Sequence, residues 1–200
     1  MKQTLCRPRK PKEPGICDRE PDEKLETYDD VVDDYIHRYR DSAQAERQFF
    51  KNCSFQRAIR YAGLCKRSDG KRHGHHQRRS KMTLIEVESV LQECAEEMRT
   101  CETFHDLSEL IDGKICSIYD VGPLLVYDAA TVIGAHLGLN PDRIYLHSGT
   151  AQGTKAILRV RGRKTINRSE LPSAFMRLRC CEIEDCLCIY KRDLARIARQ

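Results

Sequence analysis

The sequence predicts a mainly α protein, built as a helical bundle. Apolar residues recur at alternating three- and four-residue steps in several segments, which is the period of an amphipathic helix. Start and stop signals of helices punctuate these segments, and no run of alternating polar and apolar residues indicates a strand. With 200 residues, of which 40% are hydrophobic, the chain is long enough for one ordinary domain or two small helical ones.

We expect three regions along the chain: a flexible arm over residues 1–27, an N-terminal helical region over 28–112 and a C-terminal helical region over 113–200. The arm is highly charged and holds four of the seven prolines, so it has little apolar surface to bury.

The N-terminal region is expected to form helices over 28–41, over one or two stretches between 43 and 65, over 84–99 and over 104–112. Thr83 and Glu86 have the spacing of a capping box at the start of the third of these. Thr103 and Asp106 form the same signal for the last one, which Gly113 is expected to end.

In the C-terminal region we expect a short helix over 114–119, a tight turn at 120–123, an extended or one-turn piece at 144–147, and helices over 124–137, 150–158, 170–178 and 180–198. The helix over 124–137 is apolar on nearly all sides, so we expect it at the centre of the C-terminal core, ended by Gly138. Pro141 after Asn140 is a helix-start signal, and Ser169 is expected to cap the helix after it.

Charge is concentrated in short segments of a chain whose net charge is +5. Residues 66–81 carry seven Lys and Arg against one Asp, and residues 155–168 carry six with no acid. Such segments suit a polyanion, because each phosphate neutralised releases counterions. The alternative is a pair of solvated loops. The acidic stretch 18–34 would then either shield a basic segment or dock a protein partner.

Residues 115–133 resemble a helix-hairpin-helix, in which backbone N–H groups of a Gly-hydrophobic-Gly turn bind a DNA phosphate. Val121 and Gly122 match the second half of that turn, Asp120 stands where its first glycine would be, and Pro123 lacks an N–H donor. A plain helical hairpin turn is the alternative. The wider stretch loosely resembles the helix-hairpin-helix base-excision DNA glycosylases, and their aspartate falls on Asp142.

The resemblance and the basic segments together predict a nucleic-acid-binding protein, with double-stranded DNA as the first expectation. Leu124 stands where some of those glycosylases have a lysine, so Schiff-base chemistry is not implied. The phosphate-binding residues are expected to be Lys114, Val121, Gly122, Lys71, Arg72, Arg78, Arg79, Lys155, Arg159, Arg161, Arg163 and Lys164.

Two other function classes stay open. One is a glycosylase- or nuclease-like enzyme with Asp142 or Asp128 as its acid. Asp128 lies among apolar residues, so burial would require a partner, either Thr131 or a basic residue of another segment. The other is a protein-interaction module, antitoxin-like or an adaptor.

Two groups of residues have the side chains of a metal site, although no cofactor is expected. The first is His73, His75 and His76, for which contact with phosphate is the alternative. The second is Cys180, Cys181, Cys186 and Cys188, for which burial as small apolar side chains is the alternative.

The eleven cysteines and the N-terminal residues bear on location. An odd number of cysteines, with no apolar stretch behind the first charges, predicts reduced thiols and a cytoplasmic protein. No apolar run approaches the roughly 20 residues of a membrane helix, so no membrane partner is expected.

Overall fold

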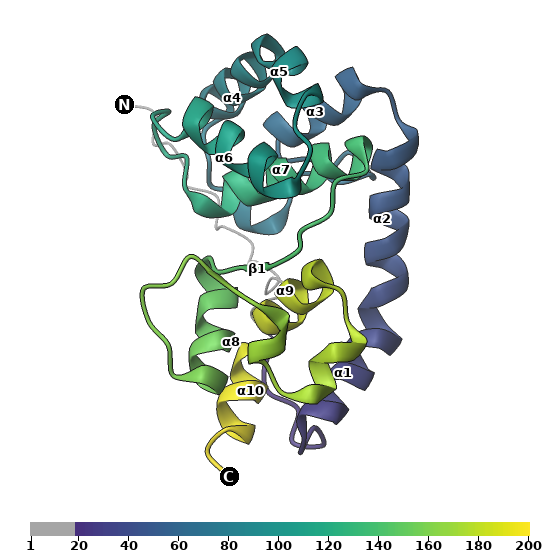
Figure 1. Cartoon of the computed structure of the whole chain (residues 1–200), viewed down its shortest axis with the longest axis vertical. Coiled ribbons are helices and arrows are strands. Elements are labelled where there is room, and N and C mark those ends of the chain that lie inside the picture. The colour runs from purple at the N-terminus through teal and green to yellow at the C-terminus, as the bar shows by residue number, and fades with distance from the viewer. Residues whose placement is uncertain (1–18) are drawn as a thin grey trace, which may run out of the picture.

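The computed structural model describes residues 19–200 and confirms a mainly α fold. The described chain forms two helical lobes, one above the other in Figure 1. We call residues 41–137 the middle lobe and residues 19–40 with 144–200 the terminal lobe, because each has its own core of buried apolar side chains. No helix in the described part is long and apolar enough to cross a membrane.

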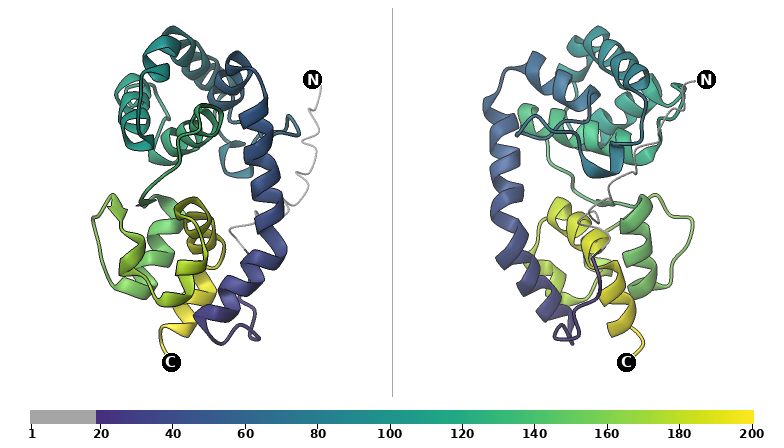
Figure 2. Two further views of the ribbon diagram at one scale, coloured as in Figure 1. Left: turned by 45° about the vertical axis from the view of Figure 1, so that its right-hand side comes forward. Right: turned by 180° about the vertical axis from the view of Figure 1, so that it is seen from behind.

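One continuous helical stretch connects the lobes along their side (Figure 2). It consists of α1 (Tyr28–Tyr35), a π-helical turn (Ile36–Arg40) and α2 (Asp41–Asn52). Thr27 and Asp30 form the capping box that starts it. The sequence predicts a helix ending near residue 41, but residues 28–52 contain no Gly or Pro, so nothing interrupts the helix before Cys53 becomes extended.

The middle lobe adds five helices: α3 (Phe55–Gly63), α4 (Lys81–Glu93), α5 (Ala95–Arg99), α6 (Phe104–Ile115) and α7 (Pro123–Leu137). Helix α7 is its central element and packs against α2, α3 and α6. The apolar helix α7 therefore shares a core with residues from Phe50 onward. The expected boundary at 112/113 falls inside this core and does not separate the two cores. Periodicity shows that a helix is buried, but not against which partner.

Two of the four predicted helix ends that follow lie where the sequence places them, and two do not. Thr103 and Asp106 form a capping box, and Gly138 ends α7 with φ +79°, so both expectations are confirmed. The cap of α4 is Ser80 rather than Thr83, which lies buried inside the helix. Gly113 does not end α6, because the apolar spacing continues through Ile115, which is fully buried.

The terminal lobe is completed by α8 (Ser148–Leu158), α9 (Cys180–Ile189), α10 (Lys191–Ile197), two 3₁₀ turns (Arg168–Glu170 and Ser173–Arg177) and a two-stranded antiparallel sheet of β1 (Ile144–Tyr145) and β2 (Thr165–Ile166). Helix α8 packs on α9 and α10. Pro141 starts no helix, because the chain there crosses between the lobes. Residues 170–178 form 3₁₀ turns rather than the expected helix.

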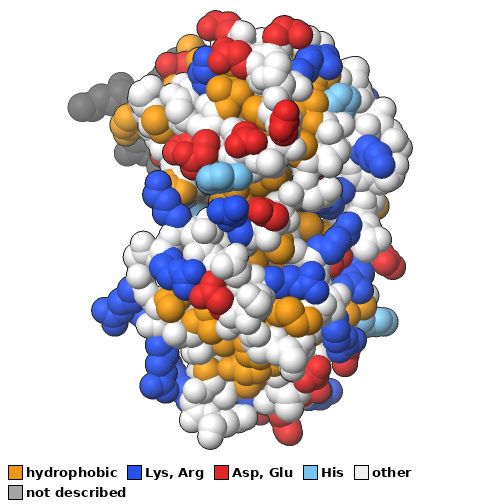
Figure 3. Space-filling view, in the orientation of Figure 1, with side chains coloured by type: hydrophobic (Ala, Val, Ile, Leu, Met, Phe, Trp, Pro, Cys, Tyr) orange, Lys and Arg blue, Asp and Glu red, His pale blue; other side chains and the backbone are white. Residues whose placement is uncertain are grey.

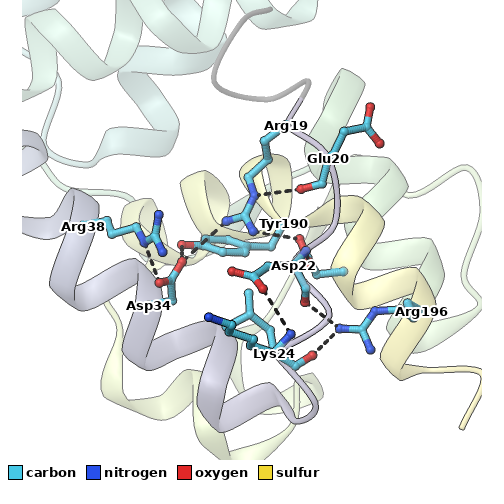
Figure 4. Close-up of polar contacts among 10 residues, drawn as sticks. Arg19, Glu20, Asp22, Lys24, Asp34, Arg38, Tyr190 and Arg196 are labelled. Atoms are coloured by element: carbon cyan, nitrogen blue, oxygen red, sulfur yellow. Dashed lines mark hydrogen bonds and ion pairs between the residues drawn. The ribbon is translucent and has the colours of Figure 1, made fainter.

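Part of the expected arm is packed against the terminal lobe (Figure 4). The Arg19 guanidinium lies 4.6 Å from the centre of the Tyr190 ring, and the Asp22 N–H donates to Asp193 at 2.7 Å. Arg196 donates to the Asp22 carbonyl at 2.9 Å. Residues 19–27 are therefore held in place, whereas 1–18 lie outside the described residues.

The acidic stretch pairs within its own lobe. Asp29 and Asp33 face Arg177, and Glu20 lies 2.6 Å from Arg192. Among the described residues, no ion pair joins an acid of 19–34 to a Lys or Arg of the basic segments 66–81 and 155–168. The described part of the stretch thus forms ion pairs within the terminal lobe, and none of its acids balances a Lys or Arg of either basic segment.

Candidate functional site

Polar side chains from both lobes gather where the lobes meet. Loop 66–81 contributes three imidazoles, α7 a carboxylate, and the start of α8 and the body of α9 an imidazole and a carboxylate. We call this group the interlobe cluster: His73, His75, His76, Asp128, His147 and Glu184. The loop is held locally by an isolated bridge between Lys66 and Arg72 and by a hydrogen bond from the His73 N–H to the Cys65 carbonyl.

Asp128 is the centre of the middle-lobe half of the cluster. Its Oδ2 lies 2.8 Å from His75 Nε2 and 2.7 Å from His76 Nε2. The His76 side chain is fully buried, while the Asp128 side chain is 20% exposed. The partner of this carboxylate thus comes from another segment, as one of the two sequence alternatives has it, but it is a pair of histidines and not Thr131.

Arg79 joins the cluster to the turn between α6 and α7. Its Nε donates to His76 Nδ1 at 3.1 Å, so His76 carries its proton on Nε2 and donates it to Asp128. Its Nη1 lies 3.0 Å from Asp120 Oδ1 in the turn. One guanidinium therefore fixes a tautomer in the cluster and balances the acidic residue of the turn.

Burial and hydrogen bonding set the charge states. Burial by itself would raise the pKa of Asp128, but the hydrogen bonds from His75 and His76 outweigh it and hold the pKa below its usual range. Burial lowers the pKa of His73 and of His76. At neutral pH this half of the cluster therefore holds an ionised Asp128 beside neutral rings of His73 and His76.

The His147 ring faces the cluster from the terminal lobe and forms no hydrogen bond within the described chain. It is 7% exposed, and neither ring nitrogen has a hydrogen-bond partner among the described residues. Its Nε2 lies 3.3 Å from Glu184 Oε1, which also accepts from the Thr150 hydroxyl. Burial lowers the pKa of His147 to about 4, so the ring is neutral at pH 7. A buried, unsatisfied imidazole of this kind calls for a functional explanation.

The turn between α6 and α7 exposes Tyr119 and Asp120 and is followed by the start of α7. Asp120 adopts φ +64°, the left-handed region that favours glycine, at the position where the helix-hairpin-helix turn has its first glycine. Gly122 is the N-cap of α7 and offers no side-chain cap. Pro123 has no N–H, and the N–H groups of Leu125 and Val126 donate to the Gly122 carbonyl, so the Leu124 N–H is the donor that the first turn leaves available. Tyr119 beside Asp120 is 88% exposed.

The basic segment 155–168 lies at the end of α8 and in the loop after it. Lys155, Arg159, Arg161 and Lys164 are exposed and form no ion pair within the described chain, whereas Arg163 pairs with Glu170. On the face in Figure 3, Lys and Arg side chains gather on the lower lobe and acidic side chains on the upper one. Lys114 lies 2.7 Å from Glu97, so its charge is already balanced.

Two other candidate sites do not assemble. Asp142 lies exposed between the lobes, and both its carboxylate oxygens face the neighbouring Arg143, at 3.0 and 3.2 Å. The four cysteines of α9 form no metal-binding group in the described chain. Cys181 and Cys188 share a face of α9, but seven residues of helix separate them by about 10 Å. The interpretation as buried thiols fits Cys181 and Cys186, whereas Cys180 and Cys188 are partly exposed.

Three residues of the site, His147, Glu184 and Tyr119, are missing from the site residues expected from the sequence. A metal at His73, His75 and His76 is disfavoured in the sequence because Asp69 and Cys65, the nearest acid and thiol, lack ligand spacing, whereas Asp128 comes from more than 50 residues away. Tyr119 could have been found from the sequence, because an aromatic residue beside a tight turn is a local signal. No protein-family model, curated protein or solved structure matches this chain, so its site rests on its own geometry.

Proposed function

We propose that this protein binds nucleic acid, with duplex DNA as the first expectation, through the α6–α7 turn and the loop 66–81 beside it. The contact between Arg79 and Asp120 is the observation that carries this proposal. It joins the basic loop to the turn, and it neutralises the one acid in the turn that would repel a phosphate.

The chemistry of this surface suits a phosphate backbone. Lys71 and Arg78 in the loop are exposed, and the N-terminus of α7 offers the Leu124 N–H and a favourable dipole. Tyr119 adds an exposed ring that can lie against a sugar or a base. The second basic segment, around residues 159–164, lies on the same flank of the molecule as the start of α7 in Figures 1 and 2, where a long polyanion would reach both lobes.

Fluorescence anisotropy of a labelled duplex, titrated at several salt concentrations, tests the proposal. The variant Lys71→Ala/Arg78→Ala should bind more weakly, and its log–log salt slope should be shallower by about 0.9 for each phosphate that the variant no longer neutralises. Lys24→Ala/Lys51→Ala removes the same charge from exposed positions outside both basic segments and should change the slope little. Asp120→Gly should tighten binding, because it removes an acid and suits the left-handed φ.

Two outcomes would contradict this function. One is the absence of binding at low salt. The other is an equal loss of affinity in the two double variants, which would show a general effect of net charge. In either case the protein should be pursued as a protein-interaction module.

A second candidate function is an enzyme that processes nucleic acid, with Asp128 as its carboxylate. The interlobe cluster favours it, since a carboxylate held in place by hydrogen bonds to two imidazoles is suited to proton transfer. Asp128→Asn should abolish turnover of a duplex while leaving binding intact. Asp142→Asn, which changes an exposed carboxylate paired with Arg143, should leave turnover unchanged. Equal activity of wild type and Asp128→Asn would exclude this role.

A further inference from the structure

We infer that the interlobe cluster is a binding site for a divalent transition-metal ion, held by His75, His76 and Asp128 of the middle lobe, with His147 of the terminal lobe as a further ligand. This site does not depend on nucleic-acid binding.

The donor set is the first argument. His75 Nε2, His76 Nε2 and a carboxylate oxygen of Asp128 all lie within 4.8 Å of one another. Two imidazole nitrogens and a carboxylate oxygen are a donor set that Zn²⁺ and its neighbours in the first transition series accept. The ligands come from a loop and from the middle of a buried helix, so the helix fixes Asp128 while the loop adjusts.

His147 is the second and independent argument. Its ring is buried, and neither of its nitrogens has a hydrogen-bond partner among the described residues, although Nε2 lies 3.3 Å from Glu184 Oε1. Its ring centre lies 4.7 Å from that of Tyr127, the neighbour of Asp128 on α7. His147 is outside the group whose donor atoms lie within 4.8 Å of one another, so its ring must move toward the ion to bind it. A metal ion at the cluster would give one of these nitrogens a partner. It would also link the terminal lobe to the middle lobe at the point where they meet.

Acidic groups around the site favour a cation. Glu184 lies beside His147, and the charge of Asp128 contributes to the raised pKa of Asp185 on α9. Arg79 disfavours a cation at the site, both by its positive charge and by its hydrogen bond to His76 Nδ1. For His76 to bind a metal through Nε2, its proton must move to Nδ1, and the guanidinium must turn away.

A substitution of Arg79 therefore tests whether His76 is a ligand. In Arg79→Gln the positive charge is removed, and the new amide oxygen can accept from His76 Nδ1–H. We therefore expect Arg79→Gln to bind metal more tightly than the wild type. Weaker binding in this variant would contradict the assignment of His76 as a ligand.

Isothermal titration of the full chain, freed of metal by a chelator, tests the site with Co²⁺ and Zn²⁺ as the ions. We expect one ion per chain, with affinity lowered roughly 100-fold or more in Asp128→Asn and in His75→Ala, since even loss of an outer partner of a ligand commonly costs 10–100-fold. His147→Phe should weaken binding as well. Asp142→Asn and His105→Ala change a carboxylate and an imidazole outside the cluster and should bind as the wild type does.

The chain holds eleven cysteines, so the Co²⁺ spectrum is needed to identify the ligands. Nitrogen and oxygen ligation predicts visible d–d bands without a thiolate-to-cobalt charge-transfer band. Cys116→Ser, which removes an exposed thiol, should leave the spectrum unchanged. A thiolate band would overturn the proposal. So would the absence of stoichiometric binding, or equal affinity of the wild type and folded Asp128→Asn, whose fold circular dichroism verifies without metal.

Discussion

Gly153→Ala is expected to lower the free energy of unfolding by about 3 kcal/mol, at the upper end of what overpacking usually costs. Gly153 lies where α8 crosses α9. A Cβ there would overlap the Leu187 carbonyl oxygen and lie 2.9 Å from the carbonyl carbon. Both atoms belong to the backbone of α9, so they yield only if the helices separate. Urea unfolding followed by circular dichroism measures the change.

Gly113→Ala is the matched control for this prediction. Gly113 lies inside a helix as well, but a Cβ there would meet nothing within 4 Å. The substitution should therefore stabilise the protein by about 0.5–1 kcal/mol, because alanine loses less backbone entropy in a helix. Equal and small effects of the two substitutions would show that α8 and α9 do not pack as closely as described.

Asp185→Asn is expected to stabilise the protein at pH 7 by about 2 kcal/mol and to lose this effect as the pH falls toward 4. Burial raises the pKa of Asp185 to about 6, despite the hydrogen bond that its Oδ2 accepts from the Tyr35 hydroxyl at 3.1 Å. The folded state therefore binds more protons than the unfolded state between about pH 4 and pH 6. The free energy of unfolding of the wild type therefore falls as the pH rises through that range, because the buried carboxyl becomes charged. The variant has a neutral amide at this position and does not show this fall.

Asp142→Asn is the control for the pH experiment. Its carboxyl is exposed, and the hydrogen bond from Arg143 lowers its pKa, which is the opposite direction. The substitution should change the midpoint of thermal unfolding little at either pH. If Asp185→Asn instead destabilises the protein equally at pH 5 and pH 7, then the side chain stabilises the terminal lobe through contacts that an amide cannot make.

The local features of the fold could be predicted because their causes lie within a few residues. The capping box at Thr103 needs only Asp106, three residues on, and the left-handed end of α7 needs only Gly138. At Gly113 burial overrode a local preference, because the apolar face of the helix continues past this residue to the buried Ile115. At Thr83 the cause is a competing local signal: Ser80 caps the helix three residues earlier, and its hydroxyl accepts from the Thr83 N–H.

The basic segments could also be found from the sequence, since exposed charge is a local property. The residues that these segments contact in the folded protein could not be found from the sequence. Arg79 belongs to a run of cations, but only folding brings it to Asp120 on one side and His76 on the other. The acidic stretch is equally plain in the sequence, yet it pairs with Arg177 and Arg192 of its own lobe rather than with either basic segment.

The sequence by itself determined the helical class, several helix ends and the positions of the charged segments, because helix period, caps and charge runs act over a few residues. Only the tertiary structure decided how the chain divides into lobes and which side chains form the interlobe cluster. His76 and Asp128 are 52 residues apart, and they meet because α7 is apolar on nearly all sides and must be buried. That burial carries a single carboxylate inward, where it requires the partners that loop 66–81 provides.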